Sequence, residues 1–356
     1  MTWTRVAVMV KGAGLLGLAA ALTAWSAAAA AYAPAGPSAA TGAVATVVAT
    51  LATAGAVAWR LGRGRAKAAG AMLACIVWGG TLAWFWWVPA PGSGDWLPEC
   101  AVAPVVTGDT ADSTRFTVHG IRDFRYLGTD RCIEPAWNTR SFSLDQLRTV
   151  DLFFSFWGPT LICHNFVTFG FETPDGWDHV AVSIEVRKRR GQSYSAVGGL
   201  FRQFALVFIW AEERDVVRVR TDFRGESVHR YRLLLTDAQA RNLFLHYLDE
   251  TRRLREAPRW YNAVTQSCGV DIIRTASGDR MGVFPSPWQL LNGTWERRAW
   301  DFGRLGPAAT FEEERAAANV TADAKMSPSG SAREFSAAIR KRDTTWRPAV
   351  EIRGRP

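Results

Sequence analysis

The stretch Trp157-Gly158-Pro159-Thr160-Leu161-Ile162-Cys163-His164-Asn165-Phe166-Val167-Thr168-Phe169-Gly170-Phe171 decides the fold of this chain. It begins with a Gly-Pro turn signal and continues as a strand that opens at His164. A second strand is expected over residues 179–187, after the turn signal Thr173-Pro174-Asp175-Gly176. The two strands therefore form a predicted hairpin.

The apolar residues of this hairpin predict how its strands pair. They form one set on each strand: Val167, Phe169 and Phe171, then Val182, Ile184 and Val186. Side chains alternate between faces along a strand, so burying both sets on one side requires odd positions to pair with even ones. This register places His164 on the opposite face. Three residues of the second strand are expected to share that face with it: Ser183, Glu185 and Arg187.

Two residues of the chain are candidates for catalysis by a base and a nucleophile. Cys268 follows Ser267, which can cap a helix running from Gly269, and a helix N-terminus lowers the pKa of a thiol. Backbone N–H groups there would contribute to an oxyanion hole. His164 is the expected base, and Glu185 would hold its imidazole in one tautomer. The alternative is structural, because a lone cysteine or histidine more often packs than reacts. Cys163 faces away from His164 and is expected only to pack.

Three uncharged apolar runs precede this region. They cover residues 12–33, 43–59 and 69–90, and each has roughly the ~20 residues that cross a hydrocarbon core, the second being the shortest. We expect three transmembrane helices in an anchor of residues 1–91. A signal peptide cleaved after Ala30 is the alternative for the first run, and the two runs behind it disfavour that alternative.

Basic residues predict how the anchor is oriented. Arg5 and Lys11 precede the first run, and four more basic residues lie between the second and third: Arg60, Arg63, Arg65 and Lys67. Residues 34–42 carry no charge. Positive loops stay in the cytoplasm, so the N-terminus should be cytoplasmic and everything after Pro91 should lie outside the inner membrane. Trp84, Trp86 and Trp87 would then form an aromatic belt at the outer end of the third helix, with ordinary core packing as the alternative.

The remaining chain should form a linker over residues 92–115, an α+β domain with an antiparallel sheet over residues 116–310, and a peripheral tail over residues 311–356. The net charge of +9 fits either attraction to anionic headgroups or a solvated arginine-rich surface. Nucleic acid is not expected as a partner, because an extracytoplasmic domain without a binding motif does not meet it. Cys100 and Cys132 could pair in an oxidising compartment, and the sequence does not fix that pairing.

Along the domain, we expect strands over residues 150–157, 204–210, 216–221 and 228–235. Residues 116–126 should be an irregular lead-in with short strands, and residues 142–147 a short helix or turn. Residues 191–199 are rich in Gly and Ser and are expected to form a lid or lipid-entry loop. A helix should follow the capping box made by Thr236 and Gln239, with an apolar stripe in the core.

From residue 116 to about 340, the chain resembles the Lnb N-terminal periplasmic domain family. The resemblance rests on phrases that match in order and spacing. They are Val150-Asp151-Leu152-Phe153, Phe156-Trp157-Gly158-Pro159, the His164 strand ending Phe169-Gly170-Phe171, Ser183-Ile184-Glu185-Val186-Arg187 and the run from Arg187 to Tyr194, Phe201-Arg202-Gln203, Glu213-Arg214-Asp215, Arg259-Trp260-Tyr261-Asn262 and Leu290-Leu291-Asn292-Gly293. One departure is Ser267-Cys268-Gly269, where the family often has Asn-Cys-Thr.

The resemblance implies a circularly permuted papain-like (NlpC-type) thiol fold. By position it assigns the base to His164 and the nucleophile to Cys268, and its correspondence at Glu185 is weaker. It associates the chain with N-acylation of bacterial lipoproteins. The expected activity is a cysteine acyltransferase that moves an acyl chain from phospholipid to an amine such as a lipoprotein N-terminus. We expect substrate contacts from Trp157, Arg187, Tyr261 and Asn262, and neither metal nor cofactor. The alternatives are a papain-like cell-wall peptidase or amidase and a non-catalytic membrane module. The sequence leaves the oligomeric state open.

Overall fold

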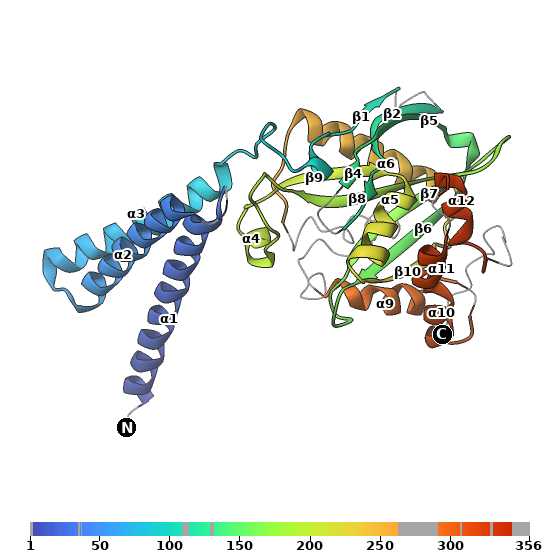
Figure 1. Ribbon diagram of the computed structural model, residues 1–356. Coiled ribbons are helices and arrows are strands. Elements are labelled where there is room, and N and C mark those ends of the chain that lie inside the picture. The colour runs from blue at the N-terminus through green and yellow to red at the C-terminus, as the bar shows by residue number, and fades with distance from the viewer. Residues whose placement is uncertain are drawn as a thin grey trace. The chain divides into compact units, whose positions relative to one another are not determined.

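The computed structural model describes residues 3–34, 36, 38–108, 114–128, 132–262, 291–306, 308–327 and 330–343. These residues form two compact units. The first contains the described residues up to Pro91 together with 191–205 and 259–262. The second contains residues 92–190, 206–258 and the described residues from 291 onward. Figure 1 shows the elements of both units.

Three long helices dominate the first unit: α1 (Trp3–Tyr32), α2 (Ala39–Leu61) and α3 (Gly64–Trp87). Among the described residues, 13–32, 39–61 and 64–87 are long and apolar enough to cross a membrane, as predicted. Glycines let α2 and α3 approach closely, as small residues do between membrane helices. A Cβ on Gly55 would lie 2.8 Å from the backbone nitrogen of Ala74, and one on Gly70 would lie 2.4 Å from that of Trp59.

An eight-stranded sheet forms the centre of the second unit, in the order β1-β2-β9-β8-β7-β6-β10, with β5 paired to β2. Most pairings are antiparallel, and β2 pairs with β9 in parallel. The strands are β1 (Val105–Thr107), β2 (Arg115–Arg122), β5 (Trp137–Ser143), β6 (Leu147–Phe156), β7 (His164–Thr173), β8 (Gly176–Arg187), β9 (Ala205–Ala211) and β10 (Ser227–Arg232). A separate pair joins β3 (Arg125–Tyr126) and β4 (Cys132–Glu134). The α+β class is therefore confirmed, and the permuted papain-like topology stays a prediction.

Helices cover both faces of this sheet (Figure 1). On one face lies α6 (Asp237–Glu256), which starts at the predicted capping box of Thr236 and Gln239. The ring of its Phe244 packs 4.9 Å from that of Phe169 on β7, centroid to centroid. The opposite face is covered by α5 (Glu213–Arg218), the π-helix η3 (Val219–Phe223) and α12 (Ala332–Ala338). Each face of the central strands is therefore buried, and only the strand ends reach the surface.

Four consecutive charged residues begin α5, and all of them are buried. Each pairs with a different part of the chain, so the run acts as a junction. The four pairs are Glu212–Arg140 on β5, Glu213–Arg340 after α12, Arg214–Asp123 after β2, and Asp215–Arg122 on β2. Buried charges need such partners, because the cost of removing an isolated charge from water is large.

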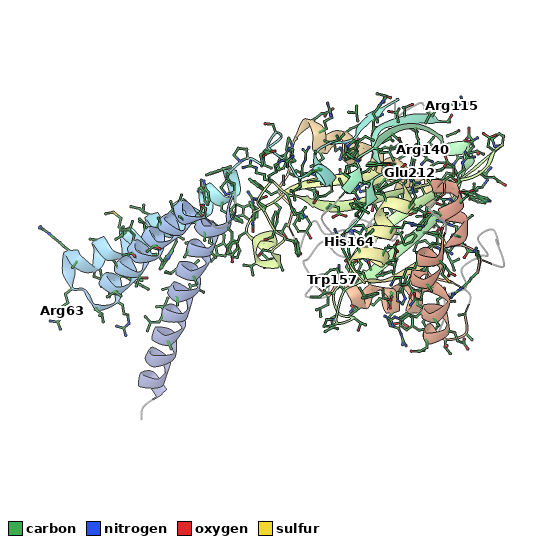
Figure 2. The ribbon with its side chains drawn as sticks, viewed as in Figure 1. Arg63, Arg115, Arg140, Trp157, His164 and Glu212 are labelled. Atoms are coloured by element: carbon green, nitrogen blue, oxygen red, sulfur yellow. The ribbon has the colours of Figure 1, made fainter. Side chains whose placement is uncertain are left out.

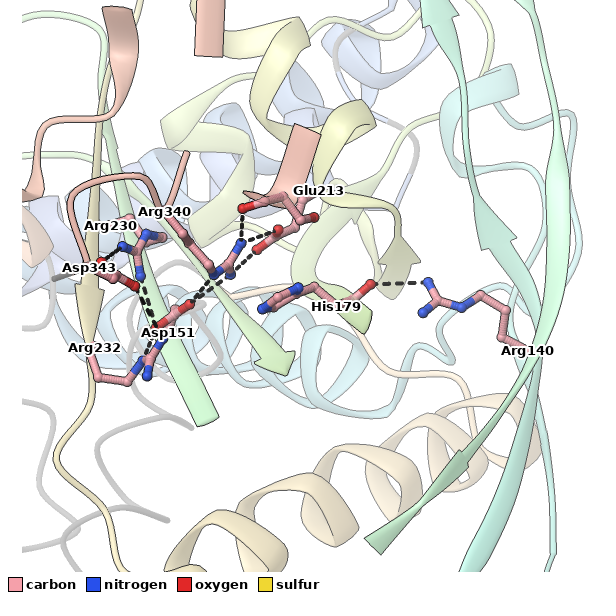
Figure 3. Close-up of polar contacts among 9 residues, drawn as sticks. Arg140, Asp151, His179, Glu213, Arg230, Arg232, Arg340 and Asp343 are labelled. Carbon is pink, nitrogen blue, oxygen red and sulfur yellow. Dashed lines mark hydrogen bonds and ion pairs between the residues drawn. The ribbon is translucent and has the colours of Figure 1, made fainter. Parts of the chain in front are cut away.

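A second buried group of charges surrounds Asp151 on β6 (Figure 3). Its carboxylate accepts from Arg232 and Arg340 and is 3.2 Å from Arg230. Burial alone would raise the pKa of Asp151, but Arg232, Arg230 and Arg340 together hold that pKa well below its usual range. The network ties β6, β10 and the C-terminal segment together.

His179 on β8 lies beside this network and carries no side-chain hydrogen bond among the described residues. Its ring is buried, and its backbone carbonyl accepts from Arg140 at 3.0 Å (Figure 3). Burial, reinforced by Arg340, lowers the pKa of the imidazole to about 3. His179 is therefore neutral at physiological pH and belongs to the core.

Several predicted elements differ in the structure. Residues 216–221 lie in α5 and η3 rather than in a strand. Their alternating Val and Arg residues are typical of a strand, but the ion pairs at the start of α5 favour a helix there. Residues 115–122 form one full strand instead of an irregular lead-in. The predicted peripheral tail instead contains α10 (Phe311–Ala318), α11 (Thr321–Met326) and α12, with Phe335 fully buried.

Candidate functional site

The register of β7 and β8 agrees with the one derived from the apolar pattern. Val167 pairs with Val182 and Phe166 with Ser183, so odd positions do pair with even ones. The odd-numbered side chains of β7 pack on α6, and His164 faces the other side. That side is where Ser183 and Glu185 also lie. The prediction that these three residues share a face is therefore confirmed.

His164 is the first residue of β7, and its Nε2 atom contacts both polar residues of β8. Nε2 is 2.7 Å from the hydroxyl oxygen of Ser183 and 3.4 Å from Oε1 of Glu185. The Ser183 hydroxyl donates to the same Oε1 at 2.9 Å. The side chain of His164 is 19% exposed and that of Glu185 is 28% exposed, whereas Ser183 is fully buried. The three groups form a short hydrogen-bonded chain in which the buried Ser183 hydroxyl lies between two partly exposed side chains.

This chain of hydrogen bonds assigns the tautomer of the neutral imidazole. An ionised carboxylate only accepts, so the one proton of the Ser183 hydroxyl goes to Glu185. Ser183 must then accept from His164, which places the ring proton on Nε2. The basic nitrogen of His164 is therefore Nδ1. Ser183 is unsuited to act as a nucleophile itself, because it is buried and its proton is already donated.

Arg220 on η3 also contacts the Glu185 carboxylate. Its Nη2 donates to Oε1 at 3.1 Å, and its guanidinium carbon lies 5.1 Å from the centre of the Phe166 ring. Burial alone would raise the pKa of Glu185, but His164 and then Arg220 outweigh it and hold the pKa well below its usual range. Glu185 is therefore ionised at any pH near neutrality.

A second carboxylate, that of Glu226, also pairs with Arg220. Oε2 of Glu226 is 3.9 Å from Nε of Arg220 and accepts from the Ser155 hydroxyl at 2.5 Å. Both Arg220 and Glu226 are buried. Arg220 was not predicted as a site residue, because residues 216–221 were expected to form a strand. A single arginine carries no signal of its own, and only the fold brings it to Glu185.

The turn before His164 is held in place by Asn292 of the 3₁₀ turn η4 (Asn292–Thr294). Its side chain pairs with the backbone of Cys163: Oδ1 accepts from the amide at 2.9 Å and Nδ2 donates to the carbonyl at 2.6 Å. A Cβ on the next residue, Gly293, would lie 2.0 Å from the carbonyl oxygen of Thr160, so only glycine fits there. Asn292 was part of a matched phrase but had no predicted role.

Apolar side chains are exposed on the turn itself. Trp157, Leu161 and Ile162 each expose about half of their surface. Figure 2 labels Trp157 and His164 at the two ends of this segment. The predicted substrate residue Trp157 is thus accessible and close in sequence to the candidate base.

The other predicted substrate residues lie elsewhere. The guanidinium of Arg187 donates to the carbonyls of Cys100 and Ala101 and stacks on Trp96 at 4.5 Å. The backbone amide of Tyr261 donates to the carbonyl of Phe204, and Tyr261 and Asn262 both belong to the first unit. Their contact with substrate stays a prediction.

The candidate nucleophile Cys268 lies outside the described residues, as do Ser267 and Gly269. The meeting of Cys268 with His164 therefore stays a prediction. Cys100 and Cys132 are not joined by a disulfide, so the suggested pair is not formed in the structure. Burial raises the pKa of Cys100 to about 11, which makes it a poor nucleophile. Cys163 is buried, as expected for a packing residue.

The described residues contain no group of three His, Cys, Asp or Glu side chains that could hold a metal ion.

Comparison with known proteins gives one match. Neither a curated protein nor a solved structure matches the chain. The family model described as the Lnb N-terminal periplasmic domain matches residues 134–290, a span that includes His164, Glu185 and Cys268. With the three apolar helices, this match indicates a membrane-anchored protein whose residues 134–290 are an extracytoplasmic domain resembling the Lnb N-terminal periplasmic domain.

Proposed function

We propose that this protein is a cysteine acyltransferase of the inner membrane, with its N-terminus in the cytoplasm. In this proposal it takes an acyl chain from a phospholipid onto Cys268 and passes it to an amine, such as the N-terminus of a lipoprotein. The observation that carries the proposal is the chain from His164 through Ser183 to Glu185, with Arg220 behind it. It is the arrangement of an oriented base, and a base of this kind needs a nucleophile to activate.

The proposed reaction has two steps. Nδ1 of His164 takes the proton of the Cys268 thiol, and the thiolate attacks the ester carbonyl of the phospholipid. The C–O bond breaks, the leaving alkoxide takes the proton from His164, and a thioester and a lysophospholipid result. The amine then attacks the thioester, His164 takes the excess proton from the nitrogen and returns it to sulfur, and an amide and the free thiol form.

Two features favour lipid over cell wall as the substrate. Trp157, Leu161 and Ile162 expose apolar surface on the turn that leads into His164, and such a surface suits an acyl chain better than a polar wall fragment. The three apolar helices would also keep the domain close to a bilayer. Glu185 stays ionised throughout, so it orients and stabilises the imidazolium rather than carrying a proton.

Mass spectrometry of the full chain in phospholipid micelles tests the proposal. We expect wild type to carry a thioester-linked acyl group and Cys268→Ala to lack it. Cys163→Ala is the matched control, since it removes a buried thiol of the same domain and should leave the adduct intact. Cleavage of peptidoglycan fragments without an adduct would instead establish the peptidase. The absence of both reactions would favour the non-catalytic module.

A further inference from the structure

The segment between β8 and β9 belongs to the membrane-helix unit rather than to the sheet domain. Residues 191–205 group with the three apolar helices, and they include the short helix α4 (Ala196–Leu200). From the sequence, residues 191–199 were expected to form a Gly- and Ser-rich lid or lipid-entry loop, and that role stays a prediction. Its contacts with α1 and α3 indicate a more definite role.

Phe201 anchors the segment to the end of α1. Its ring lies 6.0 Å from that of Tyr32 and 6.4 Å from that of Trp25, and it packs against a buried cluster with Phe85. Trp25 lies seven residues before the end of α1 at Tyr32. At 1.5 Å per residue this is about 10 Å along the helix axis, so Phe201 packs against roughly the last two turns of α1.

Arg202 anchors the segment to the end of α3. Its guanidinium donates to the carbonyls of Phe85 and Trp86 and lies over both of their rings, at 4.7 and 5.1 Å from the centroids. Its backbone is left-handed, with φ of 54°, a conformation that is strained for a non-glycine residue. These contacts hold Arg202 there despite that strain.

These attachments place the segment at the depth of the lipid headgroups. Trp84, Trp86 and Trp87 at the end of α3 are exposed, and tryptophan favours the membrane–water interface. The guanidinium of Arg202 lies over the ring of Trp86, a position at which it can attract anionic headgroups. A third attachment is at the same level, since Nε1 of Trp260 donates to the carbonyl of Val88, the residue after α3.

The outward side of this segment is apolar. Val197 is 47% exposed, Leu200 is 38% exposed and Tyr194 is 55% exposed. The inward side is closed, because Gly198 and Gly199 are buried and a Cβ on Gly198 would lie 1.7 Å from Gln203. A surface helix turn with apolar side chains outward and glycines inward is the reverse of what water favours.

We propose that residues 191–204 form an interfacial membrane element. In it, the side chains of Val197 and Leu200 insert into the lipid layer at the end of α3, and Arg202 contacts the headgroups. The occupant of this apolar surface is the bilayer itself, because the segment is fixed to membrane-spanning helices at interfacial depth. This assignment does not depend on the proposed acyltransferase activity. It holds equally for a hydrolase or a non-catalytic module.

Spin-label accessibility on the full chain in proteoliposomes tests this element. Nitroxides are placed one at a time at Val197→Cys and Leu200→Cys, with Cys75, Cys132 and Cys268 replaced by Ser. The matched control is Leu127→Cys, an exposed apolar residue of the sheet domain. Unchanged melting in detergent verifies that each variant is folded.

We expect oxygen to relax the labels at 197 and 200 more strongly than a water-soluble nickel complex does, as at a lipid-exposed site. The label at 127 should respond in the opposite sense. Preferential access of the nickel complex at 197 and 200 would show that water covers the segment. Protection of both labels from both reagents would show that protein covers it. Either result would overturn the proposal.

Discussion

Replacing Glu185 by glutamine should slow acylation of Cys268 by roughly 10- to 1000-fold, and the structure explains the size of the effect. Glutamine keeps the shape of the side chain and an acceptor for Ser183 and Arg220, but removes the charge. That charge lies 3.4 Å from Nε2 of His164. At an effective dielectric constant of about 20, an imidazolium at this distance gains roughly 5 kcal/mol from it.

Two features reduce the electrostatic energy between Glu185 and the His164 imidazolium. Arg220 shares the same carboxylate oxygen at 3.1 Å, and the Glu185 side chain is 28% exposed to solvent, which screens the pair. A remaining loss of about 1.4–4 kcal/mol corresponds to the stated fall in rate. It does not exceed the contribution of general base catalysis, which is worth about 10²–10⁴-fold.

The assay is the rate at which the full chain, in mixed micelles with phospholipid, gains the acyl adduct. Glu172→Gln is the matched control, because Glu172 lies on the same hairpin and makes only an exposed ion pair with Arg148 among the described residues. Its rate should match wild type. An unchanged rate in Glu185→Gln would refute the role given to Glu185, and an equal loss in both variants would point to the hairpin fold instead.

Three further predictions test the charges and the membrane anchor. Asp151→Asn should lower the free energy of unfolding by about 3–5 kcal/mol in urea titration, because it leaves buried arginines without their shared carboxylate; the exposed Asp145→Asn should change it little. His179 has a pKa of about 3 when folded and about 6.5 when unfolded, so between these values the unfolded chain binds more protons and stability is lost as the pH is lowered. His179→Gln should therefore lose about 2 kcal/mol less than wild type between pH 7.5 and pH 5, and identical pH profiles of melting would contradict this. A reporter fused after Pro91 should be active only outside the cytoplasm, and cytoplasmic activity at that point would reverse the predicted orientation.

The hairpin could be predicted from the sequence because its two apolar sets leave one acceptable register. A shift by one residue would have exposed Val182 and Ile184, both of which are buried. The same constraint placed Ser183 and Glu185 beside His164. The membrane helices were equally accessible to prediction, because length and the absence of charge suffice to recognise them.

Arg220 could not be predicted for the opposite reason. Its segment has the alternation of a strand, and the helix that forms instead depends on ion pairs between residues up to 127 positions apart, such as Glu213 and Arg340. Asn292 was equally hidden, since its pairing with Cys163 joins residues 129 positions apart. Local pattern carries no information on contacts of this range.

The four paired charges at the start of α5 also constrain how the domain is made. Glu213 is buried, and its partner Arg340 lies 127 residues later in the chain. Because synthesis proceeds from the N-terminus, all strands of the sheet have left the ribosome well before Arg340 has been made. Contacts of such long range form slowly. The ion pairs at the start of α5 therefore stay incomplete until Arg340 has been synthesised, and a protein truncated before Arg340 would leave Glu213 without that partner.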